Sequence, residues 1–215
     1  MKKTILTLCL TISFTISIFG QTEVDEYVSI NIPGNVIKLD TIAQRLRVLN
    51  FHSENETEAY LIQRIEIDSK ESEFNGLPYD INSLKKTYQD IIRGQLKGME
   101  KTDFSFKDST EIKIDKFIGY KIRYNNSDTG MQNAESNILI LNEYAYVAIY
   151  VNGTDFNDIN KNKFLNSLKV NEANNPRQMI GNSSGFKVGY ILGKLFFYGL
   201  LVFGVIFLIK KLRKK

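Results

Sequence analysis

A long apolar run near the end of the chain is the feature that most constrains its fold. Apart from Lys194, residues 188–209 are Leu, Phe, Val, Ile, Gly and Tyr, and residues 195–209 carry no charge. At a rise of 1.5 Å per residue, a helix of this length spans about 33 Å, enough to cross the hydrocarbon core of a bilayer. Lys194 falls within the first two turns, where its stem can reach the headgroups. The run predicts a transmembrane helix over 188–209.

The residues after this run predict its orientation. The tail 210–215 is strongly basic, and short basic flanks stay on the cytoplasmic side of a membrane. Everything before residue 188 is then expected outside. A sorting signal that is removed after export has the same layout, although no LPxTG-type motif precedes the run. The membrane-orienting residues are Lys210, Lys211, Arg213, Lys214 and Lys215.

The first twenty residues have the layout of a secretory signal peptide. Lys2 and Lys3 precede an apolar stretch over 5–19, and Gly20 offers a small residue for cleavage. An uncleaved anchor would give the same topology, whereas a lipoprotein site at Cys9 is disfavoured because Leu8 stands where a small residue is needed. Asn- and Lys-rich usage with this start indicates a bacterial protein. We therefore expect a single-pass protein of the inner membrane with its domain in the periplasm.

Between these segments we expect one extracytoplasmic domain, 21–172, and a linker, 173–187, rich in Asn, Pro, Ser and Gly. The domain holds all 24 acidic residues of the chain against 18 basic ones, a formal charge of −6. Such a body repels nucleic acid, which excludes a nucleic-acid partner. The single cysteine, Cys9, lies outside the domain, so stability must come from an apolar core.

Hydrophobic periodicity predicts the elements of the domain. Alternation favours strands over 27–34, 45–52, 59–67, 110–114, 117–124, 136–141 and 144–151, the last two joined by the tight turn Asn142-Glu143. Apolar residues at steps of three and four predict amphipathic helices over 80–99 and 155–168. The order predicts an α+β fold, an antiparallel sheet flanked by helices, with the transmembrane helix added.

This order resembles the PsbP-like family. The resemblance rests on Val28-Ser-Ile-Asn-Ile-Pro-Gly34, Ile118-Gly-Tyr-Lys-Ile122 and Phe164-Leu-Asn-Ser-Leu-Lys-Val170, and it extends over 27–170. The family is named after an extrinsic subunit of the photosystem oxygen-evolving complex, and its fold occurs in a Ran-binding factor of nuclear transport. It implies an αβα sandwich in a binding or assembly subunit without catalysis. The role in photosynthesis or in Ran exchange is not implied, because fold does not fix function.

A search for chemistry gives no catalytic, cofactor or metal site. His52 is the only histidine that could serve a histidine-based triad, and its polar neighbours in a strand favour a surface residue over a catalytic base. A zinc site normally draws several Cys or His ligands, which the domain lacks. Asn126, Asp128 and Gly130, and separately the alternating Glu54, Glu56 and Glu58, lack the spacing of a calcium loop. We expect a hairpin turn and a solvated acidic edge at these two places.

Two functions remain open. The first is a membrane-anchored binding or assembly module whose partner is another envelope protein. The alternative is a carboxylate-dependent envelope enzyme, which the sequence cannot reveal because paired acids meet in space rather than along the chain.

The apolar run also holds a candidate packing face. Gly189 and Gly193 are four residues apart, which would permit close helix packing and a weak homodimer.

Overall fold

The computed structural model describes residues 21–43, 46–67, 77–99, 102–153, 156–180 and 193–194. The expected signal peptide 1–20, the basic tail 210–215, Gly189 and most of the expected span 188–209 lie outside these residues. Gly193 is described. Within the described residues, no helix is long and apolar enough to cross a membrane.

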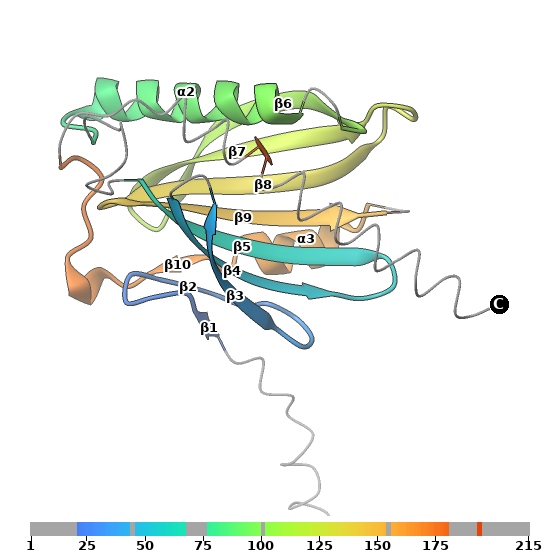
Figure 1. Ribbon diagram of the computed structural model, residues 1–215, viewed down its shortest axis with the longest axis horizontal. Helices are drawn as coiled ribbons and strands as arrows, with labels where there is room; N and C mark the ends of the chain where they lie inside the picture. The colour runs from blue at the N-terminus through green and yellow to red at the C-terminus, as the bar shows by residue number, and fades with distance from the viewer. Residues whose placement is uncertain are drawn as a thin grey trace, which may run out of the picture.

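A large antiparallel sheet of seven strands forms the centre of the domain (Figure 1), in the order β3-β4-β5-β9-β8-β7-β6. β9 lies at its middle and is buried along almost its whole length, which explains why its sequence is a nearly continuous apolar run. β8 is also largely buried, although its first half is mostly polar. The strands are β3 (Ile37–Ala43), β4 (Leu46–Glu54), β5 (Glu58–Glu66), β6 (Phe104–Ile114), β7 (Phe117–Asn126), β8 (Gln132–Leu141) and β9 (Tyr144–Asn152).

A small sheet of three short strands lies beside the large one. Its order is β1-β2-β10, and both outer strands pair antiparallel to β2. The strands are β1 (Thr22–Glu23), β2 (Val28–Ile30) and β10 (Lys169–Val170), and the 3-10 helix η1 (Glu172–Asn174) follows β10. The small sheet thus joins the two ends of the domain sequence.

Two α-helices complete the described part of the fold. α2 (Ile81–Met99) begins at a reciprocal cap, in which Asp80 Oδ1 accepts from Ser83 N at 2.7 Å and Ser83 Oγ accepts from Asp80 N at 2.9 Å. α3 (Asp158–Leu165) has only eight residues, and the side chain of Asn157 caps its first turn.

The large sheet buries a core on each face. On one face, side chains of α2 such as Tyr88 and Ile91 pack on Val147 and Ile149 of β9. On the other face, the alternate residues of β9 contact α3 and the small sheet. The second core includes Val28, Ile30, Tyr146, Tyr150, Phe164 and Leu168.

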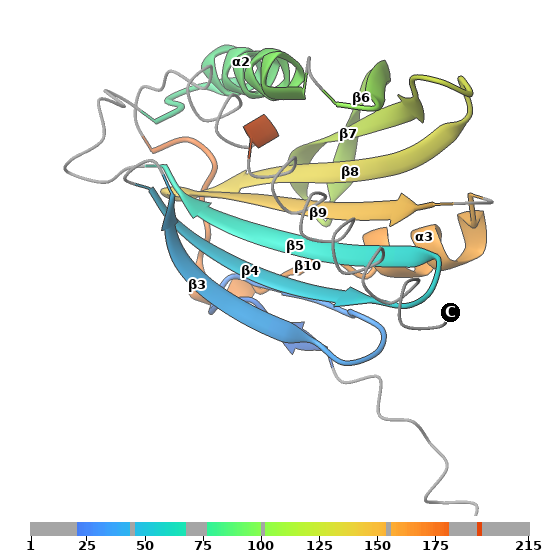
Figure 2. The ribbon, with the colours of Figure 1, turned by 45° about the vertical axis from the view of Figure 1, so that its right-hand side comes forward.

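The expected αβα sandwich is wrong, whereas the transmembrane helix expected over 188–209 lies mostly outside the described residues. The fold is β-rich, because one face of the large sheet is covered by α2 but the other is covered largely by a second sheet, with the two-turn α3 beside it (Figure 2). Residues 28–30 were expected in the main sheet, yet they pair with residues 22–23 and 169–170. The helix expected over 155–168 is confined to Asp158–Leu165.

Individual elements were predicted better than their arrangement. The helix expected over 80–99 agrees with α2, and the strands expected over 45–52, 59–67, 117–124 and 144–151 agree with β4, β5, β7 and β9 within two residues. The turn Asn142-Glu143 is confirmed, since Leu141 pairs with Tyr144 and Asn142 takes the left-handed conformation such a turn requires. β3 was missed, and β6 begins six residues before the expected 110–114.

Residues 173–180, the first part of the expected linker, lie against the domain. The backbone oxygen of Arg177 accepts from Asn142 N, and the backbone N–H of Arg177 donates to Asn142 Oδ1. The buried Gln178 accepts from Ile118 N at 2.9 Å and donates to Ile118 O at 2.7 Å and to Ile140 O at 3.0 Å. The pairing of β7 with β8 ends at Gly119 and Leu139. The side chain of Gln178 therefore replaces the missing strand-to-strand hydrogen bonds of Ile118 and Ile140, which lie just beyond.

Candidate functional site

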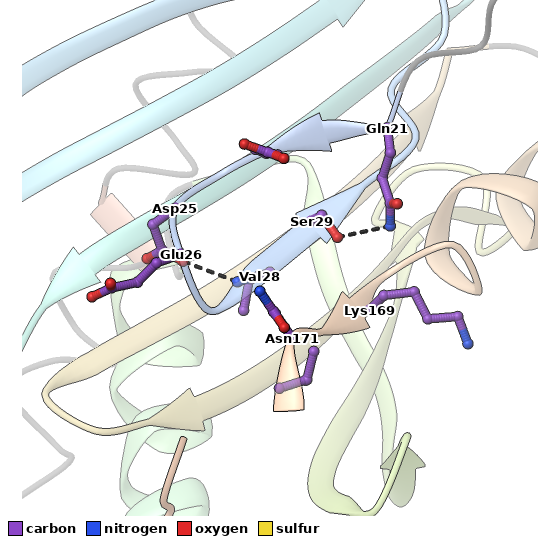
Figure 3. Close-up of a pocket in the computed structure, with 9 residues that line it drawn as sticks. Gln21, Asp25, Glu26, Val28, Ser29, Lys169 and Asn171 are labelled. Atoms are coloured by element: carbon purple, nitrogen blue, oxygen red, sulfur yellow. Dashed lines mark hydrogen bonds between the residues drawn. The ribbon is translucent and has the colours of Figure 1, made fainter. Parts of the chain in front are cut away.

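A shallow polar pocket of about 440 Å³ lies on the small sheet (Figure 3). It draws residues from the start and the end of the domain sequence, because β1 and β10 both flank β2. Its lining consists of Gln21, Glu23, Asp25, Glu26, Val28, Ser29, Lys169, Val170 and Asn171.

Asp25 holds the turn that forms one wall of this pocket. Its Oδ1 accepts from the backbone N–H groups of Tyr27 at 2.8 Å and of Val28 at 3.0 Å, which fixes the connection between β1 and β2. Its Oδ2 accepts from Tyr146 Oη at 2.6 Å and from Arg64 at 3.2 Å. Burial, and then the charge of Asp25, raises the pKa of Tyr146. Asp25 is therefore committed to joining the two sheets.

The charge of the pocket favours a cationic ligand. Glu23, Asp25 and Glu26 supply three carboxylates, whereas Lys169 supplies one ammonium group and already contacts Asp115 at 3.3 Å. Gln21 is tied to Ser29 across the pocket at 2.7 Å. Within the described ranges, no three His, Cys, Asp or Glu side chains gather to hold a metal ion. The pocket can accept an amine or guanidinium group.

The outer strand β3 is the most exposed apolar feature of the described surface. Ile37, Leu39 and Ile42 are 52%, 48% and 80% exposed. Among the described strands, β3 pairs only with β4, so the backbone groups along its other side face outward. Asp40 is held in a two-bond pair with Arg47 on β4, which keeps its pKa below the ordinary value.

Glu58 is a buried carboxylate that the sequence did not single out. It accepts from Tyr60 Oη at 2.8 Å, Tyr150 Oη at 2.7 Å, Asn160 Nδ2 at 3.0 Å and Asn55 Nδ2 at 3.1 Å. Burial alone would raise the pKa of Glu58, but these donors together lower it. Because every donor comes from a different part of the fold, the cluster ties α3 to β5 and β9.

A second buried cluster surrounds Glu135 on β8. Its carboxylate contacts Lys161 and Lys121 at 3.3 Å each, and Lys161 also contacts Asp158 at 2.6 Å. Lys161 and Glu135 are both buried, and Lys161 comes from α3. Charges buried in this way are stable only when paired, so this cluster fixes α3 on the sheet.

The remaining sequence candidates lie where ordinary structure explains them. Asn126 Oδ1 accepts from Asp128 N and Thr129 N at 2.9 Å each, which confirms a hairpin turn between β7 and β8. His52 is half-buried on β4, opposite Ile37 and Leu61. The solvated acidic edge expected at Glu54, Glu56 and Glu58 is wrong for Glu58. The signal that could have shown it is the hydroxyl of Tyr60, two residues on and thus on the same face of the strand.

Gly193 is brought against α2. A Cβ on Gly193 would meet Gly98 Cα at 2.9 Å and would come closer still to Gln95 O. The sequence pointed to Gly193 as a helix-packing residue, but not to a surface of the domain as its neighbour.

Comparison with known proteins assigns no family. No family model matches the sequence, and the curated proteins yield no significant match. The likeness to PsbP-like proteins stays a prediction.

Proposed function

We propose that this protein is an extracytoplasmic binding module that takes up an extended segment of another envelope protein along β3. The observation that carries the proposal is the row of exposed apolar side chains on β3 at an outer edge of the large sheet. Membrane attachment is part of the proposal and rests on the sequence of residues 188–209 alone.

A strand edge of this kind fits an extended peptide. Peptides that add a strand to a sheet gain affinity from backbone hydrogen bonds and specificity from alternate side chains. On β3, Ile37 and Leu39 point to one face and Ile42 to the other, so a partner strand would meet apolar contacts on both faces. Natural sheets avoid exposed apolar edges unless they are covered, which supports a binding role for this one.

The charge of the domain indicates the kind of partner. Its formal charge of −6 would draw a basic segment toward it and would slow an acidic one. The acidic pocket on the small sheet adds a place for a lysine or arginine side chain of the same partner. We therefore expect a segment in which apolar and basic residues alternate.

The alternative of a carboxylate-dependent enzyme gains no support from four carboxyl groups whose pKa is shifted in the folded domain. The pKa values of Asp40, Glu58, Asp80 and Asp108 are all lowered. A general acid working near neutral pH needs a raised pKa instead.

The test compares substitutions on β3 with a matched one elsewhere. Leu39→Lys and Ile42→Lys place charge on the proposed edge, whereas Ile159→Lys adds the same charge to α3, where Ile159 is 68% exposed. Circular dichroism should show that all three variants fold, because each changes an exposed side chain. Tagged full-length protein is then purified from gently solubilised membranes.

We expect the co-purified envelope protein to be retained by wild type and by Ile159→Lys. Recovery should fall about tenfold or more in the β3 variants, the loss expected when an interface contact worth about 1.4 kcal/mol or more is removed. Equal recovery from all variants would overturn the proposal. Recovery only of a differently tagged second copy of the chain would show that β3 pairs with itself and not with another protein.

A further inference from the structure

Two backbones touch where residues 193–194 meet α2. A Cβ added to Gly98 would lie 2.8 Å from Gly193 Cα and 2.9 Å from Lys194 N. Contacts below 3.0 Å essentially never occur for real Cβ atoms, so neither glycine tolerates a side chain in this position. Figure 2 shows the short piece 193–194, in dark red, directly beside α2 and above β8. The piece is seated on the domain.

The side of α2 that receives this piece is made of small residues. Gly94 and Gly98 are four residues apart and so lie on the same side of the helix. Small residues at this spacing let a second chain segment approach closely. Gln95, between them, is only 1% exposed, and neither polar atom of its amide has a hydrogen-bond partner within the described part of the chain.

An earlier residue of the chain, Gln178, also contacts α2. Gln178 Nε2 lies 3.3 Å from the hydroxyl of Tyr88, two turns before Gln95. The chain therefore contacts α2 at residue 178 and again at residue 193.

We propose that α2 is the docking site of the chain's own C-terminal apolar segment, with Gly98 and Gly193 as the point of closest approach. The docked position is then a second state of the segment, distinct from the membrane-spanning state that the proposed function includes. The proposal does not depend on the binding of a partner at β3.

Docking at Gly193 competes with crossing of a bilayer. Residues 195–209, the uncharged part beyond the contact, number fifteen. As a helix they would reach about 22 Å at 1.5 Å per residue, short of the hydrocarbon core of about 30 Å. A full span needs the residues from 188 onward, and these include Gly193. The segment would thus have to leave α2 in order to span the membrane.

Cross-linking of the full chain tests the docked position. In a Cys9→Ser background, Lys97→Cys and Lys194→Cys place one thiol beside each contacting glycine. A short bismaleimide should join them within one molecule, seen as a mobility shift of the monomer. The control pair is Lys194→Cys with Lys163→Cys, because Lys163 lies on α3 and α3 packs on the opposite face of the large sheet.

Glycine-to-alanine substitutions then test the close contact between the two backbones. Gly193→Ala or Gly98→Ala should lower the cross-linked fraction at least fivefold, because the added Cβ would meet backbone atoms. Gly153→Ala is the matched control, since its Cβ would meet only Thr57 O at an ordinary 3.8 Å. Gly193→Ala lies outside the sheets and leaves their folding unchanged, which far-UV circular dichroism should verify.

Three outcomes would overturn the proposal. One is a cross-link between the thiols at positions 97 and 194 that is no stronger than the cross-link of the control pair, both in detergent and in membranes. Another is an undiminished cross-link in the two alanine variants. The third is a product of dimer mass only, which would place the segment on a neighbouring copy.

Discussion

The hydroxyl of Tyr146 in the large sheet donates a 2.6 Å hydrogen bond to Asp25 in the small sheet. The same carboxylate oxygen accepts from Arg64, whose guanidinium lies 4.7 Å from the ring centroid of Tyr144. One carboxylate thus fixes a turn through one oxygen and joins the sheets through the other. The small sheet has only short strands, so this junction helps to fix its position together with the buried side chains of Val28 and Ile30.

Asp25→Ala should destabilise the protein strongly. It removes two turn hydrogen bonds and leaves the buried Tyr146 hydroxyl and Arg64 without their acceptor, at a cost of about 2–4 kcal/mol. Urea unfolding followed by circular dichroism measures the loss. The neighbouring Glu26→Gln is the control and should change stability by less than about 0.5 kcal/mol. A similar small effect for Asp25→Ala would contradict the proposed junction.

Glu58 should make the stability of the domain depend on acid pH. Its folded pKa lies below the ordinary 4.5, so its contribution is complete above pH 4.5 and disappears as pH falls through the folded value. Glu58→Gln should therefore be less stable than wild type at neutral pH, and the difference should shrink below about pH 4. Thermal melting across pH 3–7 gives both curves. A constant difference at every pH would show that the carboxylate charge does not matter.

The packing of Gln178 predicts where the folded domain ends. A fragment over 21–172 lacks Gln178 and exposes the backbone groups of Ile118 and Ile140 that it pairs, whereas a fragment over 21–180 keeps them. We expect the shorter fragment to be less stable by about 2–3 kcal/mol. Gln178→Ala in the longer fragment should reproduce most of this loss in urea titrations. Equal stability of the two fragments would mean that residues 173–180 add nothing to the fold.

Gln95→Met should stabilise the protein. The amide of Gln95 is buried with both polar atoms unpaired in the described structure, and a buried polar group without a partner costs about 1–3 kcal/mol. Methionine has a similar shape and no such cost. The expected gain is about 1 kcal/mol in unfolding free energy. Gln63→Met should give a smaller gain, because it also removes the hydrogen bond from Gln63 Nε2 to Asn50 at 2.8 Å, although the oxygen of Gln63 is unpaired in the described structure.

Local patterns predicted most elements of this fold but not how they come together. Alternation was enough for β4 and β5, because one face of each strand is consistently buried, whereas β9 is buried on both faces and reads as a continuous apolar run. β3 was not predicted, because its described side chains are exposed on both faces and its sequence therefore shows no alternation of buried and exposed residues. The placement of Val28–Ile30 depends on Lys169–Val170, about 140 residues away, and no local signal carries that pairing.

The candidate site was harder to predict for the same reason. The pocket combines residues 21–29 with 169–171, and Glu58 receives donors from Tyr150 and Asn160. A glutamate at a turn looks solvated when it is considered by itself. Only the packing of α3 on β9 turns Glu58 into a buried junction.

The strand order of the large sheet also has a consequence for how the chain folds. β3, β4 and β5 form one run of hairpins, β6 to β9 form another, and the two runs meet only where β5 pairs with β9. Each run closes through short loops, whereas the seam between them closes a loop that contains α2 and three strands. Long loops delay contact formation, so zipping of this seam should limit the folding rate, and mutations along it should slow refolding more than mutations within either run.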